Sequence, residues 1–207
     1  MKIEDAGFDW KVIGPDVADV DYVAWQCDQD AYATIGQKCS AQSICFIHEN
    51  WMDANLLAKM KRNAEARSLS DLTAGPVLTH TTKEILDHAN SVAAVEGAEI
   101  LWGGKELENH KIPEIYGAVH PTAVFVPLKE MMKEENFPLC STELFAPFQV
   151  VTTYNDDSVE IVLEALEKMS HHLTAAVVSN DLEFQSKILS STVNGTTYVG
   201  RRARTTG

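Results

Sequence analysis

Apolar residues recur along the chain in two patterns that predict alternating helices and strands. A repeat near 3.6 residues predicts one-sided helices over four segments: 54–67, 81–96, 157–170 and 181–191. Short runs rich in apolar and β-branched residues predict strands over six segments: 42–48, 98–102, 122–127, 148–153, 173–178 and 193–199. Several runs are apolar throughout, which is typical of parallel strands covered on both faces. We therefore expect an α/β fold with a largely parallel sheet covered by helices.

Two local signals refine this prediction. Thr81 and Glu84 have the spacing of a capping box, which places the start of the second helix at residue 81. Gly103 and Gly104 open a polar stretch to about residue 118 that favours a surface hairpin or loop. No stretch rich in Pro, Gly and Ser divides the 207 residues, so we expect one domain over 1–207.

The composition narrows the class of protein. Hydrophobic residues make up 45% of the chain and charged residues 23%, which excludes a disordered chain, a collagen and a coiled coil. No apolar run approaches the ~18 residues that cross a bilayer, so no membrane association is expected. The net charge is -13, and the basic cluster of Arg201, Arg202 and Arg204 is small. Nucleic acid is therefore not an expected partner.

The cysteines are Cys27, Cys39, Cys45 and Cys140, and the first ten residues do not resemble a secretion signal. Reduced thiols in an intracellular compartment are therefore the default expectation. Cys39, Cys45 and His48 lie close in sequence, but their spacing fits no common zinc pattern. No metal site is predicted.

The strongest candidate for a catalytic segment is 36–41, which reads GQKCSA. A glycine turn lets backbone and substrate approach closely. A thiol beside backbone N–H groups and a lysine, as Cys39 is beside Lys38, can act as a nucleophile. The residues alone leave a second interpretation open, because a lone cysteine is often a small buried apolar side chain.

Four segments resemble, in order, the motifs of the aldehyde dehydrogenase superfamily. Residues 36–41 are similar to the Gly-Gln-x-Cys motif, which carries the catalytic thiol. Residues 3–7 (IEDAG) resemble the segment whose glutamate is the general base, and residues 72–77 (LTAGPV) resemble a Gly-Pro segment between helices. Residues 143–148 (ELFAPF) resemble the Glu-x-Phe-Gly-Pro motif, which holds the nicotinamide ribose. The resemblance covers essentially the whole chain.

Within the superfamily, the resemblance is closest to the plant-type 1-pyrroline-5-carboxylate dehydrogenases. It is carried by five longer segments: 6–16 (AGFDWKVIGPD), 21–32 (DYVAWQCDQDAY), 36–43 (GQKCSAQS), 173–181 (LTAAVVSND) and 193–207, which contains VNGTTY and RARTTG. This resemblance implies the fold of an aldehyde dehydrogenase catalytic domain. It also implies oxidation of L-glutamate γ-semialdehyde to glutamate with NAD, the last step of proline breakdown.

The resemblance assigns a role to five residues. Cys39 would attack the aldehyde carbon to give a thiohemiacetal and then, after hydride leaves to NAD, a thioester. Glu4 would activate the water that hydrolyses this thioester. Glu143 would accept hydrogen bonds from the ribose hydroxyls, and Phe145 would pack against the nicotinamide. Ser40 would bind the α-carboxylate of the substrate, although a plain packing role stays open.

Three positions depart from the superfamily pattern. Thr34 stands where asparagine is common, and Ala146 stands where the ribose motif has glycine. The effect of Ala146 depends on its φ angle. Residues 5–8 read DAGF instead of the usual Gly-Gly-Lys continuation.

No glycine-rich dinucleotide fingerprint is present in the 207 residues. The resemblance implies that the NAD-binding domain and the oligomerisation segment belong to a longer parent, of which 1–207 is a catalytic-domain fragment. The fragment alone is then expected to be inactive, and the parent to be a homo-oligomer of the mitochondrial matrix. Two alternatives stay open: a non-catalytic truncated fragment, and a dehydrogenase for a different aldehyde. The sequence does not distinguish NAD from NADP.

Overall fold

The computed structural model describes residues 7–206, and its centre is a seven-stranded sheet in the order β3-β4-β5-β2-β1-β6-β7. The strands are β1 (Asp9–Ile13), β2 (Gln42–His48), β3 (Glu99–Trp102), β4 (Thr122–Phe125), β5 (Phe148–Tyr154), β6 (Thr174–Val178) and β7 (Thr196–Val199). Neighbouring strands run parallel except β3, which is antiparallel to β4. The predicted largely parallel sheet is thus confirmed, with one antiparallel edge.

The antiparallel edge has a simple cause. A parallel pair of consecutive strands needs a crossover connection, usually a helix. Residues 103–121, which join β3 to β4, contain no helix. They form the loop expected from Gly103-Gly104, and the chain therefore returns beside β3 in the opposite direction.

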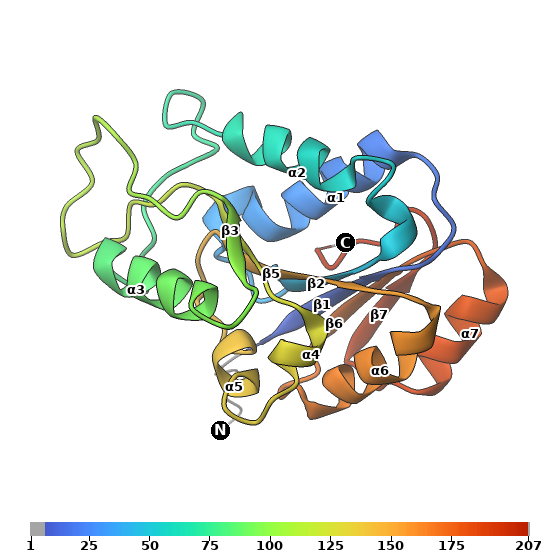
Figure 1. Cartoon of the computed structure of the whole chain (residues 1–207). Helices are drawn as coiled ribbons and strands as arrows, with labels where there is room; N and C mark the ends of the chain where they lie inside the picture. Colours follow the sequence, from blue (N-terminus) through green and yellow to red (C-terminus); the bar gives the residue numbers. More distant parts are fainter. Residues whose placement is uncertain (1–6, 207) are drawn as a thin grey trace, which may run out of the picture.

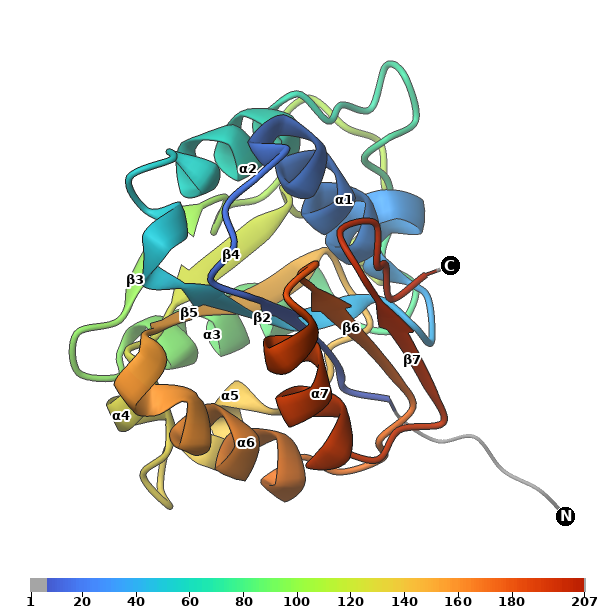
Figure 2. The same ribbon diagram turned by 90° about the vertical axis from the view of Figure 1, so that its right-hand side faces the viewer.

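Helices cover both faces of the sheet (Figures 1 and 2). The helices are α1 (Val20–Tyr32), α2 (Leu56–Glu65), α3 (Thr82–Ala93), α4 (Leu128–Met131), α5 (Phe137–Cys140), α6 (Val159–Lys168) and α7 (Leu182–Ser190). Helices α1 and α2 lie on one face and α3 to α7 on the other, so the sheet separates two hydrophobic cores. Within residues 7–206, no helix is long and apolar enough to cross a bilayer.

The local signals behave as the sequence predicts. The Thr81 hydroxyl accepts a hydrogen bond from the Glu84 N–H, and the Glu84 carboxylate accepts one from the Thr81 N–H at 2.7 Å, so α3 starts with the predicted capping box. Helix α6 turns Val159, Val162 and Leu166 into the core, as its 3.6-residue period predicts.

The sequence did not predict β1, α1 or the one-turn helices α4 and α5. Of these, β1 and α1 carry polar residues on their buried side. Strand β1 buries Lys11 completely, and α1 buries Asp28 and Asp30 along with its apolar residues. Buried charges require partners. Asp30 binds the Lys11 ammonium at 2.8 Å, and Asp28 binds the Arg67 guanidinium at 2.6 Å. A search for apolar periodicity misses β1 and α1 because charged residues interrupt the apolar residues on their buried side.

Candidate active site

The order of the strands brings three of the four motif segments together. Strands β5, β2 and β1 are adjacent and parallel, so their amino ends lie at the same edge of the sheet. Gly7 lies just before β1, the thiol turn of residues 36–41 just before β2, and residues 143–147 just before β5. Segments that are up to 140 positions apart in the sequence therefore meet at one place.

The thiol turn packs directly on the ribose-motif segment. Gly36 has a φ of +67°, and a Cβ there would lie 2.2 Å from the carbonyl oxygen of Ala146. Only glycine allows both this backbone conformation and this close approach. Inside the turn, the Gln37 N–H donates to the Thr34 carbonyl and the Ala41 N–H donates to the Lys38 carbonyl. The turn presents Cys39 to solvent.

The turn is preceded by two residues in the left-handed region. Thr34 and Ile35 both have a φ of 57°. Left-handed backbone is unfavourable for β-branched residues and is tolerated by asparagine and glycine. The left-handed backbone at position 34 therefore suits the asparagine that is common in the superfamily better than the threonine of this chain.

The Gly-Pro segment is held against the same turn by Gln37. Its side-chain amide donates to the Pro76 carbonyl at 3.0 Å, and its amide oxygen accepts from the Leu78 N–H at 2.8 Å. One side chain thus pairs with both a carbonyl and an N–H of the backbone at residues 76–78. We did not assign a role to Gln37 from the sequence, although the Gly-Gln-x-Cys pattern contains it.

Glu143 lies on the opposite side of the turn and reaches the segment before β1. Its Oε2 accepts a hydrogen bond from the Gly7 N–H at 2.8 Å. Gly7 is also close to the thiol turn, since a Cβ there would lie 2.9 Å from the Cys39 carbonyl oxygen. Glu4, the predicted base, falls outside the described residues. The structure describes Gly7, three positions later, between Glu143 and the Cys39 backbone.

Phe145, and not Ala146, takes the strained backbone of the ribose motif. Phe145 has a φ of 49°, whereas Ala146 is not among the described residues with positive φ. The alanine therefore needs no left-handed backbone, and the second departure costs little there. The Thr79 hydroxyl donates to the Phe145 carbonyl at 3.3 Å, which joins this loop to the Gly-Pro segment as well.

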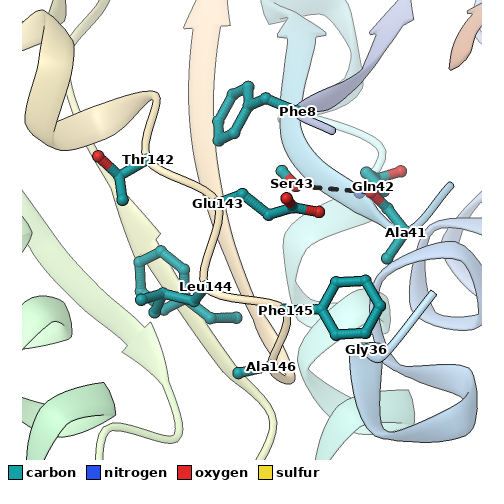
Figure 3. Close-up of a pocket in the computed structure, with 11 residues that line it drawn as sticks. Phe8, Gly36, Ala41, Gln42, Ser43, Thr142, Glu143, Leu144, Phe145 and Ala146 are labelled. Carbon is teal, nitrogen blue, oxygen red and sulfur yellow. Dashed lines mark hydrogen bonds between the residues drawn. The ribbon is translucent and has the colours of Figure 1, made fainter. Parts of the chain in front are cut away.

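A small cavity lies between the loop and the strand ends. Its volume is about 10 Å³, room for about one water molecule, and Glu143, Phe145, Gly36 and Phe8 are among its lining residues. Figure 3 shows the Glu143 side chain reaching from its loop toward residues 41–43, with Phe8 and Phe145 on either side. Ser40, next to the thiol, is half-buried.

The four thiols differ in exposure. Cys39 is exposed, whereas Cys27, Cys45 and Cys140 are buried. Burial raises the pKa of Cys140 to about 11 and that of Cys45 well above its usual value. A hydrogen bond with Cys45 lowers the pKa of Cys27, but Cys27 has no exposed surface. Exposure therefore makes Cys39 the thiol that an external electrophile can reach.

No group of three or more His, Cys, Asp and Glu side chains within residues 7–206 is arranged to hold a metal ion. Cys45 and His48 lie on β2, and Cys39 lies in the turn before it.

Comparisons with known proteins show the family of this chain. Residues 4–206 match the aldehyde dehydrogenase family. The chain belongs to the aldehyde dehydrogenase family. The match includes all four motif segments except Ile3, and it agrees with the resemblance on which the site was predicted.

Two plant relatives match the full chain. A probable aldehyde dehydrogenase of Linum usitatissimum is 62% identical over 100% of this chain and 38% of its own length. Delta-1-pyrroline-5-carboxylate dehydrogenase 12A1, mitochondrial, of Arabidopsis thaliana is 59% identical over 100% of this chain and 37% of its own length. This chain therefore spans less than two fifths of these relatives.

Solved structures show the same fold. A 1-pyrroline-5-carboxylate dehydrogenase from Thermus with bound NAD superimposes with a TM-score of 0.72 and 25% identity, over 94% of this chain and 35% of that one. A bifunctional proline utilization A protein superimposes with a TM-score of 0.76 over 95% of this chain and 19% of that one. The largely parallel sheet with helices is thus the fold of the aldehyde dehydrogenase catalytic domain.

Proposed function

We propose that residues 1–207 are the catalytic-domain part of a longer dehydrogenase that oxidises L-glutamate γ-semialdehyde to glutamate with NAD, in proline breakdown. One observation carries the proposal. The exposed thiol of Cys39 lies in a turn that packs against both the Glu143–Ala146 loop and Gly7, the described end of the Glu4 segment. The Arabidopsis relative, named a delta-1-pyrroline-5-carboxylate dehydrogenase, supports the choice of substrate.

In this proposal the chain supplies a nucleophile and a base. The Cys39 thiolate attacks the aldehyde carbon, and the Cys39 main-chain N–H stabilises the resulting oxyanion. Loss of hydride from this thiohemiacetal leaves a thioester on Cys39. Glu4 then removes a proton from the attacking water, and hydrolysis releases glutamate and the free thiol. Ser40, next to the thiol, donates a hydrogen bond to the α-carboxylate of the substrate.

The residues present suit one part of the cofactor. NAD, when bound, supplies the acceptor for the hydride. A carboxylate matches a ribose diol, because each hydroxyl can donate to an oxygen of Glu143, and the aromatic ring of Phe145 offers a packing surface. The neighbouring cavity of about 10 Å³ is too small for a nicotinamide ring. In this proposal, the longer parent supplies the rest of the cofactor site. This chain alone should therefore bind NAD weakly, with a dissociation constant above the low micromolar range in calorimetry.

Two properties of the parent follow as proposals. The Arabidopsis relative is named mitochondrial, which supports a mitochondrial location for the parent of this chain. We also expect the parent to be a homo-oligomer, as the family resemblance implies. Light scattering on the purified full-length protein tests the second expectation.

The central experiment uses the full-length protein. NADH formation is followed with L-glutamate γ-semialdehyde and with a short unbranched aldehyde as the comparison substrate. The wild type should prefer the semialdehyde. Cys39→Ala should abolish turnover, and Cys140→Ala, which alters a buried thiol away from the turn, should retain it. A wild type that prefers the simple aldehyde would show a dehydrogenase of different specificity, and a Cys39→Ala variant with full activity would refute the role of the thiol.

Glu4→Gln separates the two half-reactions, because it keeps the side-chain shape and removes the base. Loss of a general base costs about 10²–10⁴-fold in rate. The loss should fall on thioester hydrolysis, so stopped-flow should record a burst of about one NADH per active site and then slow turnover. Absence of the burst would place Glu4 in thiol deprotonation instead. Unchanged steady-state turnover would remove Glu4 from the mechanism.

A further inference from the structure

Lys38, which precedes the thiol, extends away from Gln37 and toward the end of α1. Its ammonium donates to the Gln29 carbonyl at 2.9 Å and to the Asp30 carbonyl at 3.1 Å. Gln37, on its other side, binds residues 76–78. The two residues before Cys39 thus attach the turn to two different parts of the fold.

The end of α1 is a favourable place for an ammonium. The last four carbonyls of a helix lack partners within the helix, and the helix dipole places partial negative charge there. Helix α1 has no basic residue in its own last turn. Lys38 supplies the missing cation from the turn before β2, which leaves α1 and the thiol turn connected by charge-assisted hydrogen bonds.

The residue that receives Lys38 is itself held firmly. The fully buried Asp30 carboxylate accepts from the Lys11 ammonium at 2.8 Å and from the Thr205 N–H at 2.9 Å. It also accepts from the Arg204 guanidinium at 2.9 Å and the Thr206 hydroxyl at 2.7 Å. The Asp30 backbone is therefore a rigid anchor point, fixed by strand β1 and by the C-terminal segment.

We propose that Lys38 is a positioning residue for Cys39, because its ammonium ties the thiol turn to the C-terminal end of α1. Gly36 packs the turn against Ala146, and Lys38 attaches it to the end of α1. The ammonium points at α1 carbonyls, so Lys38 acts through the backbone of the turn. This inference rests on the proposed function, in which Cys39 is the nucleophile.

The pKa of Lys38 reflects the burial of its ammonium at the end of α1. Burial lowers the pKa of Lys38 to about 8; Asp30 opposes this change, and Arg204, Arg67 and Lys11 add to it. A neutral amine still carries two N–H donors. The contact with both carbonyls therefore persists above this pH.

The test combines two measurements on Lys38→Met, which removes the donors but keeps the length, and on Lys38→Arg, which keeps them. The first is amide hydrogen exchange on this chain in the peptide that covers residues 36–42, where the Gln37 and Ala41 N–H groups are hydrogen-bonded within the turn. The second is kcat and KM for aldehyde oxidation by the full-length protein. Lys61→Met, at an exposed position on α2, is the matched control.

Lys38→Met should speed exchange of the 36–42 peptide by about 10- to 100-fold, the loss expected for hydrogen bonds to a charged group. Peptides from β6 should be unchanged. In the full-length protein kcat should fall by a similar factor while KM changes less than twofold, and Lys38→Arg should restore both readouts to within threefold of wild type. The control variant should match wild type throughout.

Unchanged exchange in the 36–42 peptide of Lys38→Met would overturn the proposal whatever the activity. Exchange that rises equally in β6 would overturn it too, because Lys38 would then only support global stability. If the wild-type full-length protein oxidises no aldehyde while the exchange result is as expected, the proposed function fails and the anchoring of the turn stands. A loss of kcat in Lys38→Met that Lys38→Arg does not restore would also contradict the positioning role of Lys38.

Discussion

Replacing Asp30 with asparagine should destabilise this chain by about 3–5 kcal/mol, the usual cost of removing one partner of a buried ion pair. Asp30 and Lys11 both have fully buried side chains, and their charged atoms are 2.8 Å apart. The substitution leaves the Lys11 ammonium buried without a counter-charge. It also turns one acceptor oxygen into a donor that faces other donors.

The structure also predicts that the two partners are not equivalent. With Lys11→Met, the Asp30 carboxylate keeps Arg204, Thr205 and Thr206 as donors and loses one charged hydrogen bond. Such a bond contributes about 1.5–3 kcal/mol, and burial of the methionine side chain offsets part of this loss. Lys11→Met should therefore cost clearly less than Asp30→Asn.

Urea unfolding followed by tryptophan fluorescence measures both costs, because Trp10 and Trp51 are buried reporters. For a chain of this size, 3–5 kcal/mol corresponds to a melting point lower by about 6–20 °C. Lys61→Met, which removes the exposed Lys61–Glu65 pair, serves as the control and should stay within about 0.5 kcal/mol. An Asp30→Asn cost under 1 kcal/mol, or a larger cost for Lys11→Met, would refute the reasoning.

The pH dependence has a definite sign. Burial would raise the pKa of Asp30, but Lys11 and the hydrogen bonds outweigh it and hold the pKa below the ordinary value of 3.8. A carboxylate with a lowered pKa contributes stability above its unfolded pKa and loses it as the pH falls through its folded pKa. The difference in stability between wild type and Asp30→Asn should therefore be constant near neutral pH and shrink below about pH 4.

Three further predictions concern the thiol turn. Brief treatment with limiting iodoacetamide should label Cys39 before Cys140 and the other buried thiols in mass spectrometry; faster labelling of a buried cysteine would contradict the assignment. In a ¹³C NMR titration, the lysine with a midpoint near pH 8 should be Lys38, since burial lowers its pKa, and that midpoint should vanish in Lys38→Arg; a midpoint near 10.5 would contradict this. Thr34→Asn should raise the unfolding free energy by about 1 kcal/mol, because it relieves the left-handed strain at φ 57°, and unchanged or lower stability would show that no such strain exists.

Much of the fold and of the site could be read from local patterns. Helices α2, α3, α6 and α7 and strands β2 to β7 were predicted within a few residues, because periodicity encodes which side of an element faces the core. The capping box at Thr81 is equally local. Glycine and a thiol in one short turn made the segment around Cys39 a candidate, and its resemblance to the Gly-Gln-x-Cys motif assigned the role of nucleophile to Cys39.

What the sequence by itself determined is thus the succession of α and β elements, their apolar sides and the identity of the candidate nucleophile. Only the tertiary structure showed β1 and α1, which contain the buried Lys11–Asp30 pair. The charges of this pair interrupt the apolar periodicity from which other elements were predicted. The tertiary structure also decided that Glu143 meets Gly7, 136 positions away. The physical reason is the same in both cases: a buried polar group is stable only beside its partner, and partners so distant in sequence become neighbours only through the order of the strands.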